Sequence, residues 1–166
     1  MPNQDGCLYD LEDADLYVEG SYRIDTKGYA CRNYGRCPAL HSIIAYRAFG
    51  APTPEQTEID HKDNNPLNNK RDNLRWCTSI QNNMNRGTSS TSTSSFKGVV
   101  WHKNKNKWQA QITIERKYYF LGNFTNELEA AYAYNEAAKQ FHGEFAKLNE
   151  LPADFVSIPQ SKKRRR

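Results

Sequence analysis

Residues 59–83 read IDHKDNNPLNNKRDNLRWCTSIQNN, and this stretch decides the fold of the N-terminal half of the chain. Ile59 marks a short strand, and residues 74–77 (LRWC) predict a second strand. Asparagine and aspartate, which favour turns, dominate the loop between them. Thr78 to Gln81 has the form S/T-x-x-Q, a capping box that predicts a helix running towards Asn85 and ending near Gly87. The predicted order is strand, loop, strand, helix.

Upstream of this stretch, the sequence predicts a hairpin and a helix. Residues 22–24 and 29–31 alternate around the sequence DTKG, with Gly28 at a turn position. Apolar residues recur at helical spacing from Leu40 onwards and stop at Gly50, which is followed by two prolines. We therefore expect a short helix before the opening stretch.

A run of eight hydroxyl residues, TSSTSTSS at 88–95, divides the chain. It has nothing apolar to bury, which is typical of an interdomain linker. We expect a first module at residues 1–87, with its motif core at 57–87, and a second module at 96–150. Residues 151–166 end in KKRRR and are expected to form a basic tail. A chain of 166 residues is long enough for two small domains.

The second module is predicted to contain three strands and one helix. Runs rich in β-branched and aromatic residues occur at 99–102, 108–114 and 117–121. Asn126 caps an alanine-rich segment that stops at Gly143, and its small side chains favour close packing on a sheet. With the first module, this pattern predicts an α+β protein whose C-terminal part is a three-stranded antiparallel sheet packed on one helix.

Composition restricts the class of protein. The mean hydropathy is −0.91, and no run of roughly 18 apolar residues occurs, so we expect no membrane span. The first twenty residues hold six acids and no base, unlike a signal peptide. We expect a protein of the host cytoplasm or nucleoid, or of the nucleus if the host is eukaryotic. The acidic segment is expected either to cover basic surface or to aid solubility.

Charge in the rest of the chain favours a polyanionic partner. All 23 lysines and arginines, but only 13 of the 19 acids, follow residue 20. The four cysteines, Cys7, Cys31, Cys37 and Cys77, form no CxxC pair and are expected to be free thiols. A zinc site built on Cys31, Cys37, Cys77 and a histidine is disfavoured, because the spacing C-x5-C is a poor zinc knuckle.

Four polar residues of the opening stretch form the first candidate site. Asp60 and His61 end the first strand, Asn73 precedes the second strand, and Asn82 falls in the first turns of the capped helix. A metal-dependent phosphodiesterase needs hard oxygen ligands for a divalent ion, a base for the attacking water and a group that fixes this base. Taken singly, the same residues also fit a surface pair and turn-forming asparagines.

In these motifs the sequence resembles the HNH endonucleases of the ββα-metal type, notably the homing enzymes of phages, introns and other mobile elements. The resemblance runs from about Tyr22 to Gly87 and implies a ββα-metal fold. Its carriers are residues 40–45 (LHSIIA), 59–63 (IDHKD), 73–78 (NLRWCT) and 81–83 (QNN).

The resemblance implies one Mg²⁺ or Mn²⁺ per active site, held by Asp60 and the amide oxygen of Asn82. It implies His61 as the general base and Asn73 as the residue that accepts the other imidazole N–H. The products would be 5′-phosphate and 3′-hydroxyl ends. The family often has histidine at the last position, and the neighbouring Asn83 stays open as the ligand in place of Asn82.

Three basic side chains near these motifs have two interpretations each. Arg75 and Lys62 flank the site and either clamp phosphate or are only solvated; Arg75 is a DNA-binding candidate. His41, at the start of the upstream helix, either packs or caps there, or contacts DNA or the active site.

The second candidate site is the basic and aromatic part of the second module. Between Lys97 and Tyr118 stand six bases and one acid, whereas residues 126–150 hold five acids and two bases. A three-stranded sheet can lie in the major groove, with long basic side chains on phosphates. We therefore expect the sheet to meet double-stranded DNA. The alternative is that the lysines only aid solubility and the aromatic residues only pack on the helix.

Here the sequence resembles the plant Apetala-two/ethylene-response-factor DNA-binding domain, over residues 95–149. The motifs are 96–99 (FKGV), 107–112 (KWQAQI), 120–124 (FLGNF), 129–138 (EAAYAYNEAA) and 146–149 (AKLN). The positions that fall where that family touches DNA are Lys97, Val100, His102, Lys107, Gln111, Thr113, Tyr118, Phe120 and Asn123. Further basic candidates of the sheet are Lys103, Lys105, Arg116 and Lys117. The family has arginine where Val100, His102 and Thr113 stand, so its GC-rich target preference is not carried over.

Together the two sites predict a metal-dependent, homing-type DNA endonuclease with an appended major-groove DNA-binding domain. We expect a monomer, with a dimer on DNA as the other possibility. The rival function is a catalytically inactive DNA-binding transcriptional regulator, which would bind DNA equally in EDTA. A structural or protein-interaction module is a third interpretation.

Overall fold

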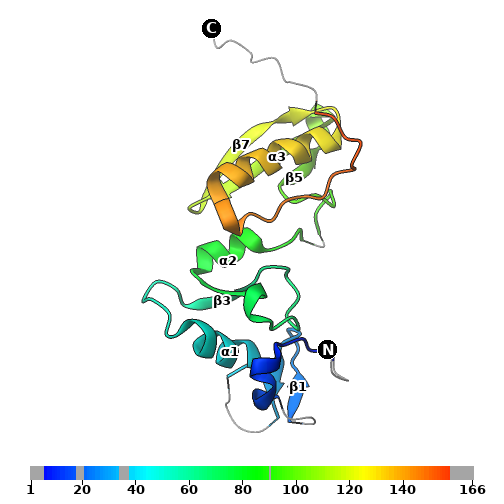
Figure 1. Ribbon diagram of the computed structural model, residues 1–166. Coiled ribbons are helices and arrows are strands. Elements are labelled where there is room, and N and C mark those ends of the chain that lie inside the picture. Colours follow the sequence, from blue (N-terminus) through cyan, green and yellow to red (C-terminus); the bar gives the residue numbers. More distant parts are fainter. Residues whose placement is uncertain (1–5, 18–20, 34–37, 90, 158–166) are drawn as a thin grey trace. The chain divides into compact units, whose positions relative to one another are not determined.

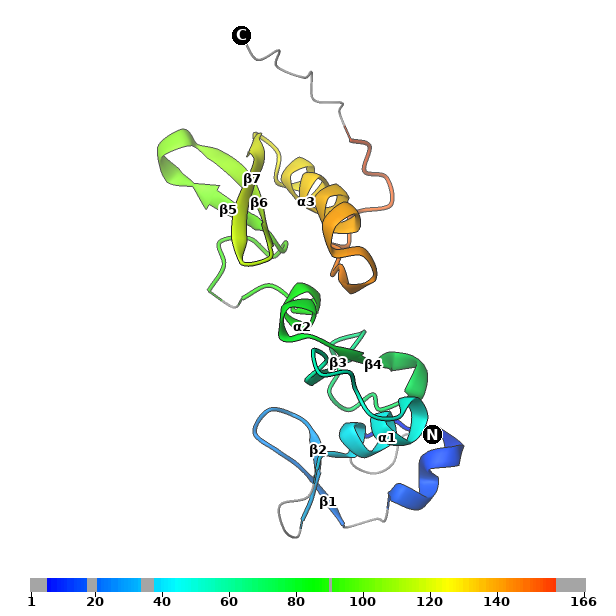
Figure 2. The same cartoon turned by 90° about the vertical axis from the view of Figure 1, so that its left-hand side faces the viewer.

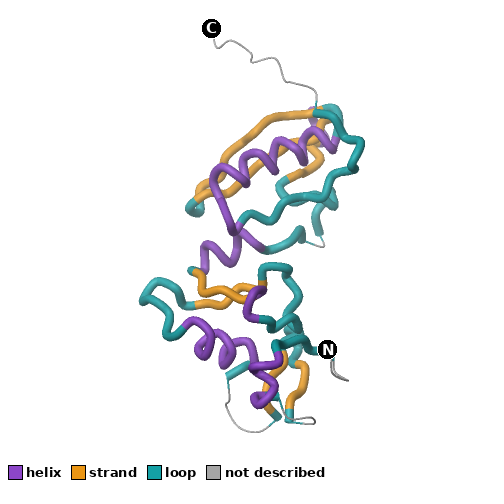
Figure 3. The backbone as a smooth tube through the Cα atoms, viewed as in Figure 1, coloured by secondary structure: helices purple, strands orange, loops and turns teal. Residues whose placement is uncertain are grey.

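The structure is a computed structural model that describes residues 6–17, 21–33, 38–89 and 91–157. The chain divides into two compact units, Met1–Arg86 and Gly87–Arg166. Each unit combines helices with strands (Figure 1, Figure 3), as the predicted α+β class requires. No helix among the described residues is long and apolar enough to span a membrane.

The N-terminal unit contains the predicted hairpin. Its strands β1 (Tyr22–Ile24) and β2 (Ala30–Arg32) pair antiparallel. The carboxylate of Asp25 accepts hydrogen bonds from two main-chain N–H groups of the turn, at 2.8 and 2.9 Å. Gly28 has a φ of +88°, a conformation that suits glycine. The turn prediction is therefore confirmed.

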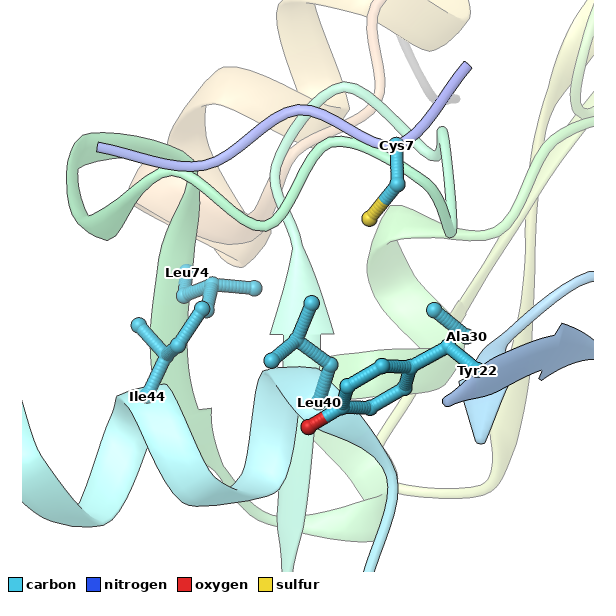
Figure 4. Packing of buried hydrophobic residues seen from close by; sticks show 6 residues of the cluster. All are labelled: Cys7, Tyr22, Ala30, Leu40, Ile44 and Leu74. Carbon is cyan, nitrogen blue, oxygen red and sulfur yellow. The ribbon is translucent and has the colours of Figure 1, made fainter. Parts of the chain in front are cut away.

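The predicted helix is α1 (Leu40–Phe49), which ends at Gly50. Leu40 and Ile44 lie one turn apart and are fully buried, so one face of α1 faces the core. Figure 4 shows these two side chains pointing towards Leu74, with the hairpin residues and Cys7 closing the cluster. The buried members of this cluster are Cys7, Tyr22, Ala30, Leu40, Ile44 and Leu74.

The opening stretch of sequence folds as strand, loop, strand and helix, as predicted. Strands β3 (Glu58–His61) and β4 (Leu74–Cys77) pair antiparallel, after a short 3-10 turn, η2 (Arg71–Asn73). Helix α2 (Ser79–Asn85) begins with the predicted capping box. The Thr78 hydroxyl accepts a hydrogen bond from the main-chain N–H of Gln81 at 3.2 Å. In return, Oε1 of Gln81 accepts a hydrogen bond from the main-chain N–H of Thr78 at 2.8 Å.

The described part of the acidic N-terminal segment is built into the fold of this unit. It forms a 3-10 helix, η1 (Leu11–Leu16), in which Asp13 is fully buried. Asp13 is bound by Arg71 at 2.7 Å and by Arg47 at 3.5 Å. The main chain of Leu8 bonds on both sides to the loop that precedes η2. The segment therefore anchors that loop.

The C-terminal unit is a three-stranded antiparallel sheet covered on one face by a helix (Figure 2). The strands are β5 (Val99–His102), β6 (Lys107–Ile114) and β7 (Lys117–Phe124), in that order. Helix α3 (Glu127–His142) begins at the Asn126 cap and buries its alanines against the sheet. The fold prediction is confirmed.

Strand β7 is three residues longer than the sequence predicts. Gly122 and Asn123 are residues typical of turns, yet Gly122 pairs with Ala110 of β6. Asn123 pairs with Gln109, and the register of the two strands shifts between Ala110 and Gln111. The strand continues because Phe124, 7% exposed, packs in the core beside α3. Burial of that ring outweighs the weak strand propensity of the two preceding residues.

Two boundaries differ from the expected linker and tail. Ser94, in the hydroxyl run, is buried and donates a 2.6 Å hydrogen bond to Glu127 at the start of α3. Thr93 accepts from the main-chain N–H of Trp101 at 2.9 Å. Beyond the sheet module, Leu151 packs against the core, and the Phe155 ring lies 6.0 Å from that of Tyr132. The unit therefore extends beyond the sheet and helix at both ends, because hydroxyl groups bond to it on one side and apolar residues pack on it at the other. The basic end at 162–166 lies outside the described residues.

Candidate active site

A cavity of about 520 Å³ in the N-terminal unit joins the hairpin, β3 and α2. Asp60, His61 and Asn82, which the sequence predicts as site residues, all line it. Asn73 and Arg75 are not among its lining residues. Lys27, Tyr29, Glu58, Asn83 and Arg86 also line it. The fold therefore brings together three of the predicted residues and adds others.

His61 is held in a defined orientation at the end of β3. Its Nε2 lies 3.1 Å from Oδ1 of Asn69, and its side chain is largely buried. Because an amide oxygen accepts hydrogen bonds, this contact places the ring proton on Nε2 and leaves the lone pair on Nδ1. No described residue bonds to Nδ1. Burial lowers the pKa of His61, although Asn69 opposes the shift, so the ring is neutral near pH 7 and able to accept a proton.

The partner of His61 corrects one sequence prediction, because Asn73 does not contact the imidazole. The Asn73 side chain accepts from the Asp63 N–H at 3.1 Å and donates to Oδ1 of Asp63 at 2.9 Å. It also donates to the carbonyl of Asn68 at 2.8 Å. Asn73 thus ties the two ends of the loop together, while Asn69, within the loop, turns towards the ring. The loop between β3 and β4 contains five asparagines, and no sequence signal singles out Asn69.

Asp60 is almost fully buried and already has protein partners. Its Oδ2 accepts from Nε and Nη2 of Arg75 at 2.8 and 2.7 Å, and its Oδ1 accepts from Nδ2 of Asn85 at 2.8 Å. Arg75 stands opposite Asp60 in the register of β3 and β4, which explains the pair. Arg75 is therefore neither a solvated arginine nor a wall of the cavity. Lys62 donates to the carbonyl of Asp72 instead.

Two neighbouring asparagines of α2 differ in how their side chains are engaged. Nδ2 of Asn83 donates to the Ser79 carbonyl at 2.9 Å, and its Oδ1 accepts from Arg86 at 3.3 Å. Nδ2 of Asn82 donates to Glu58 at 2.5 Å, and no described residue bonds to its Oδ1. Of the two amides, only that of Asn82 has an uncommitted oxygen.

The donor set fits a hard divalent ion with few protein ligands. Oδ1 of Asp60 accepts one hydrogen bond and retains a lone pair, and Oδ1 of Asn82 is uncommitted. Mg²⁺ in proteins is commonly held by one or two carboxylates or other oxygens and completes its shell with water and phosphate. Among the described residues, no three histidines, cysteines or acids converge as a metal cluster. The site is suited to an ion that shares its shell with substrate.

His41 packs against His61 from α1. The two ring centroids lie 5.2 Å apart, and the Tyr29 ring lies 4.9 Å from that of His41 and 5.8 Å from that of His61. Burial lowers the pKa of His41 to about 4, so this ring is uncharged at neutral pH. Of the interpretations left open by the sequence, the geometry favours packing next to the active site.

In the C-terminal unit, strand alternation gathers most predicted DNA contacts on the sheet face opposite α3. Ala110 and Ile112 of β6 are buried towards the helix, so Gln109, Gln111 and Thr113 point to the other side. The register of the sheet adds neighbours from β5 and β7 to this side. We call this surface the free face; it comprises Val100, His102, Lys107, Gln109, Gln111, Thr113, Tyr118, Phe120 and Asn123.

The free face carries exposed aromatic rings and a fixed polar pattern. Tyr118 and Phe120 are 55% and 53% exposed. Gln109 donates to the Tyr118 hydroxyl at 2.5 Å, and that hydroxyl donates to Oε1 of Gln111 at 2.6 Å. Lys105, in the 3-10 turn η3 (Lys103–Lys105), has its Nζ 5.9 Å from the Phe120 centroid.

Five of the predicted basic contacts lie outside the free face. Lys103 and Lys105 stand in the turn η3 between β5 and β6. Lys117 pairs with Ile114, which packs towards α3, so alternation turns Lys117 to the helix side. Lys97 precedes β5, and its main chain is bound by the side chain of Asn149. Arg116 stands in the β6–β7 turn with a φ of +65°. The charge count of the sequence could not separate the two sides of the sheet.

Comparisons with known proteins identify two kinds of relative. The family model described as HNH endonuclease matches residues 38–84. Protein 3.8 of Escherichia phage T7 is 33% identical over 118 residues, which cover 70% of this chain and 94% of the phage protein. An HNH endonuclease of Acanthamoeba polyphaga mimivirus is 34% identical over 112 residues, covering 68% of this chain and 57% of its own length.

The other kind of relative is a plant protein. APETALA2-like protein 2 of Oryza sativa subsp. indica is 42% identical over 64 residues, which are 37% of this chain and 14% of the plant protein. The match to the HNH family model includes β3, β4 and most of α2, on which His61, Asp60 and Asn82 stand. The chain therefore belongs to the HNH endonuclease family of DNA-cleaving hydrolases and is similar, in addition, to an APETALA2-like protein over 37% of its length.

Proposed function

We propose that the chain is a metal-dependent, homing-type endonuclease that cleaves double-stranded DNA at the cavity of its N-terminal unit. The observation that carries this proposal is that His61, Asp60 and Asn82 line one cavity, while Nδ1 of His61 and Oδ1 of Asn82 bond to no described residue. Asp60 and Asn82 hold one Mg²⁺ or Mn²⁺. The bound ion supplies Lewis-acid stabilisation of the negative charge that develops on the phosphate and the leaving oxygen.

His61 is the general base. Nδ1 takes a proton from the water as its oxygen bonds to phosphorus and the bond from phosphorus to the 3′ oxygen breaks. The departing oxygen takes up a proton from solvent water, which leaves a 5′-phosphate and a 3′-hydroxyl. Asn69 keeps the proton of the neutral ring on Nε2, so that the lone pair stays at Nδ1. Arg75 and Asn85 hold the Asp60 carboxylate in place.

Lys27 and Arg86 are the phosphate-binding residues of this site. Both line the cavity with exposed side chains, one from the hairpin turn and the other from the end of α2. Arg75 and Lys62, the candidates that the sequence favours, are bound by Asp60 and by the Asp72 carbonyl. Lys27 and Arg86 stand 34 and 25 residues from His61, which is why local sequence did not reveal them.

The free face of the C-terminal unit binds the major groove of the same DNA. Its amide, hydroxyl and aromatic groups suit base edges, and Lys107 and Lys105 suit phosphates. A tethered binding module raises the local concentration of DNA at a small nuclease site. With one such cavity among the described residues, a single chain nicks one strand per encounter.

Supercoiled plasmid incubated with the full chain tests this proposal. Nicking is expected in Mg²⁺ or Mn²⁺ and none in EDTA, while gel-shift binding is expected in both. Binding without cleavage across metals and salt concentrations would instead support the inactive regulator. Cleavage that is undiminished in EDTA would contradict the metal site.

A further inference from the structure

Glu58 lines the same cavity as Asp60 but has no role in the chemistry described above. The two residues stand two positions apart on β3, so their side chains leave the same face of the strand. Asp60 is held by Arg75 and Asn85. Among the described residues, the Glu58 carboxylate has no cationic partner and bonds to one side chain, that of Asn82.

The direction of that hydrogen bond determines which end of the Asn82 amide is available. An ionised carboxylate only accepts hydrogen bonds, so the group that faces Glu58 must be Nδ2 of Asn82. The amide oxygen then points away from Glu58. The two ends of an asparagine amide have nearly the same shape, but only the oxygen can bind a cation.

We propose that Glu58 is a positioning residue that selects the orientation of the Asn82 amide, so that Oδ1 and not Nδ2 is presented to the metal ion. This inference rests on the proposed function, in which Asp60 and Asn82 hold that ion. Asn83 has no need of such a partner, because its amide is bound at one end by the Ser79 carbonyl and at the other by Arg86, which follows α2. Without Glu58, the Asn82 amide rotates between two orientations, of which one places a donor where a ligand is required.

The test is a double-mutant cycle read by Mn²⁺ binding to the full chain, measured by calorimetry or by the electron paramagnetic resonance of free Mn²⁺. Glu58→Ala is expected to weaken binding about tenfold or more, within the range typical of residues that orient metal ligands. In the Asn82→Asp background both ends of the side chain are oxygen, so orientation no longer matters. There, Glu58→Ala is expected to cost far less than in the parent chain.

The cycle separates positioning from the other roles of a carboxylate. If Glu58 binds the ion directly or acts only through its charge, Glu58→Ala weakens Mn²⁺ binding by the same factor in both backgrounds, and the inference is overturned. Unchanged binding in the parent background also overturns it. If the parent chain itself binds no Mn²⁺, it is the proposed metal site that fails.

Two controls keep the result interpretable. Glu55→Ala removes a nearby carboxylate outside the cavity and is expected to leave binding unchanged. Glu58→Leu is the second variant at this position. Leucine fills more of the space of the glutamate side chain than alanine does, but it cannot accept a hydrogen bond, so its Mn²⁺ binding is compared with that of Glu58→Ala. Thermal unfolding shows which of the two Glu58 variants is folded, and Mn²⁺ binding by that variant is compared with binding by the parent chain.

Discussion

Oδ1 of Asn69 accepts a hydrogen bond from Nε2 of His61 at 3.1 Å, so a loop residue eight positions away sets the tautomer of this ring. The other end of the same amide donates to Sγ of the buried Cys7, also at 3.1 Å. The main chain of Asn69 is in turn bonded to Leu8. The N-terminal segment thus supports the orientation of His61 through Asn69.

We predict that Asn69→Ala slows DNA cleavage about 10- to 100-fold, as expected when the partner of an active-site histidine is lost. The ring would then distribute its proton between both nitrogens and rotate. Asn69→Asp retains an acceptor for Nε2 and is expected to lose less. Single-turnover cleavage at saturating protein measures the rate, and gel shifts check that DNA binding is unchanged. Equal rates for Asn69→Ala and the parent chain would show that Asn69 does not act on His61.

Asn73→Ala is predicted to act on stability. The substitution removes the three hydrogen bonds by which the partly buried Asn73 side chain closes the loop between β3 and β4. The expected loss is about 1–3 kcal/mol in the free energy of unfolding of the N-terminal unit. Urea denaturation measures it. Unchanged stability together with an altered pH profile of cleavage would restore the role that the sequence suggested for Asn73.

The stability of the N-terminal unit is predicted to fall between pH 6.5 and about 4. His41 has a pKa near 4 in the folded chain against 6.5 in the unfolded chain, so the unfolded state binds the proton first as the pH falls. Its contribution to stability is complete above pH 6.5 and decreases below it. His41→Phe, which keeps a ring beside His61 but cannot be protonated, is expected to flatten this part of the curve. Urea midpoints at successive pH values check this, and parallel curves for both proteins would contradict it.

Two lysines of the C-terminal unit provide a matched pair for DNA binding. Lys107 lies on the free face, and Lys117 lies on the helix side at the other end of the sheet. Lys107→Ala is predicted to weaken binding and to reduce the slope of log affinity against log salt by about 0.9, which is the share of one phosphate contact. Lys117→Ala is expected to change the slope less. Fluorescence anisotropy at several salt concentrations measures both, and a larger effect of Lys117→Ala would place DNA on the other side.

The sequence predicts this fold well where signals are local. The capping box at Thr78 and the stop at Gly50 depend on a few adjacent residues and are confirmed. Asp60 and His61 are adjacent on β3, and Asn82 lies one turn into the capped helix, so their common cavity follows from the ββα order.

Features that depend on the path of a loop could not be predicted in this way. Asn69 and Asn73 are the same residue type in one loop, and only the folded loop decides which reaches His61. Asp13 is buried because Arg71 and Arg47, distant in sequence, neutralise it. The hydroxyl run is partly ordered for a similar reason, since Ser94 meets Glu127 only after the C-terminal unit has folded.

The most direct test of the central claim compares the parent chain with His61→Ala on supercoiled plasmid in Mg²⁺ or Mn²⁺, at protein concentrations where gel shifts show equal binding. We predict that the parent chain nicks the plasmid and that His61→Ala binds it equally but cleaves it at least about 100-fold more slowly, because the general base is lost. Cleavage at the parent rate by His61→Ala would contradict the assignment of His61 and of the cavity around it.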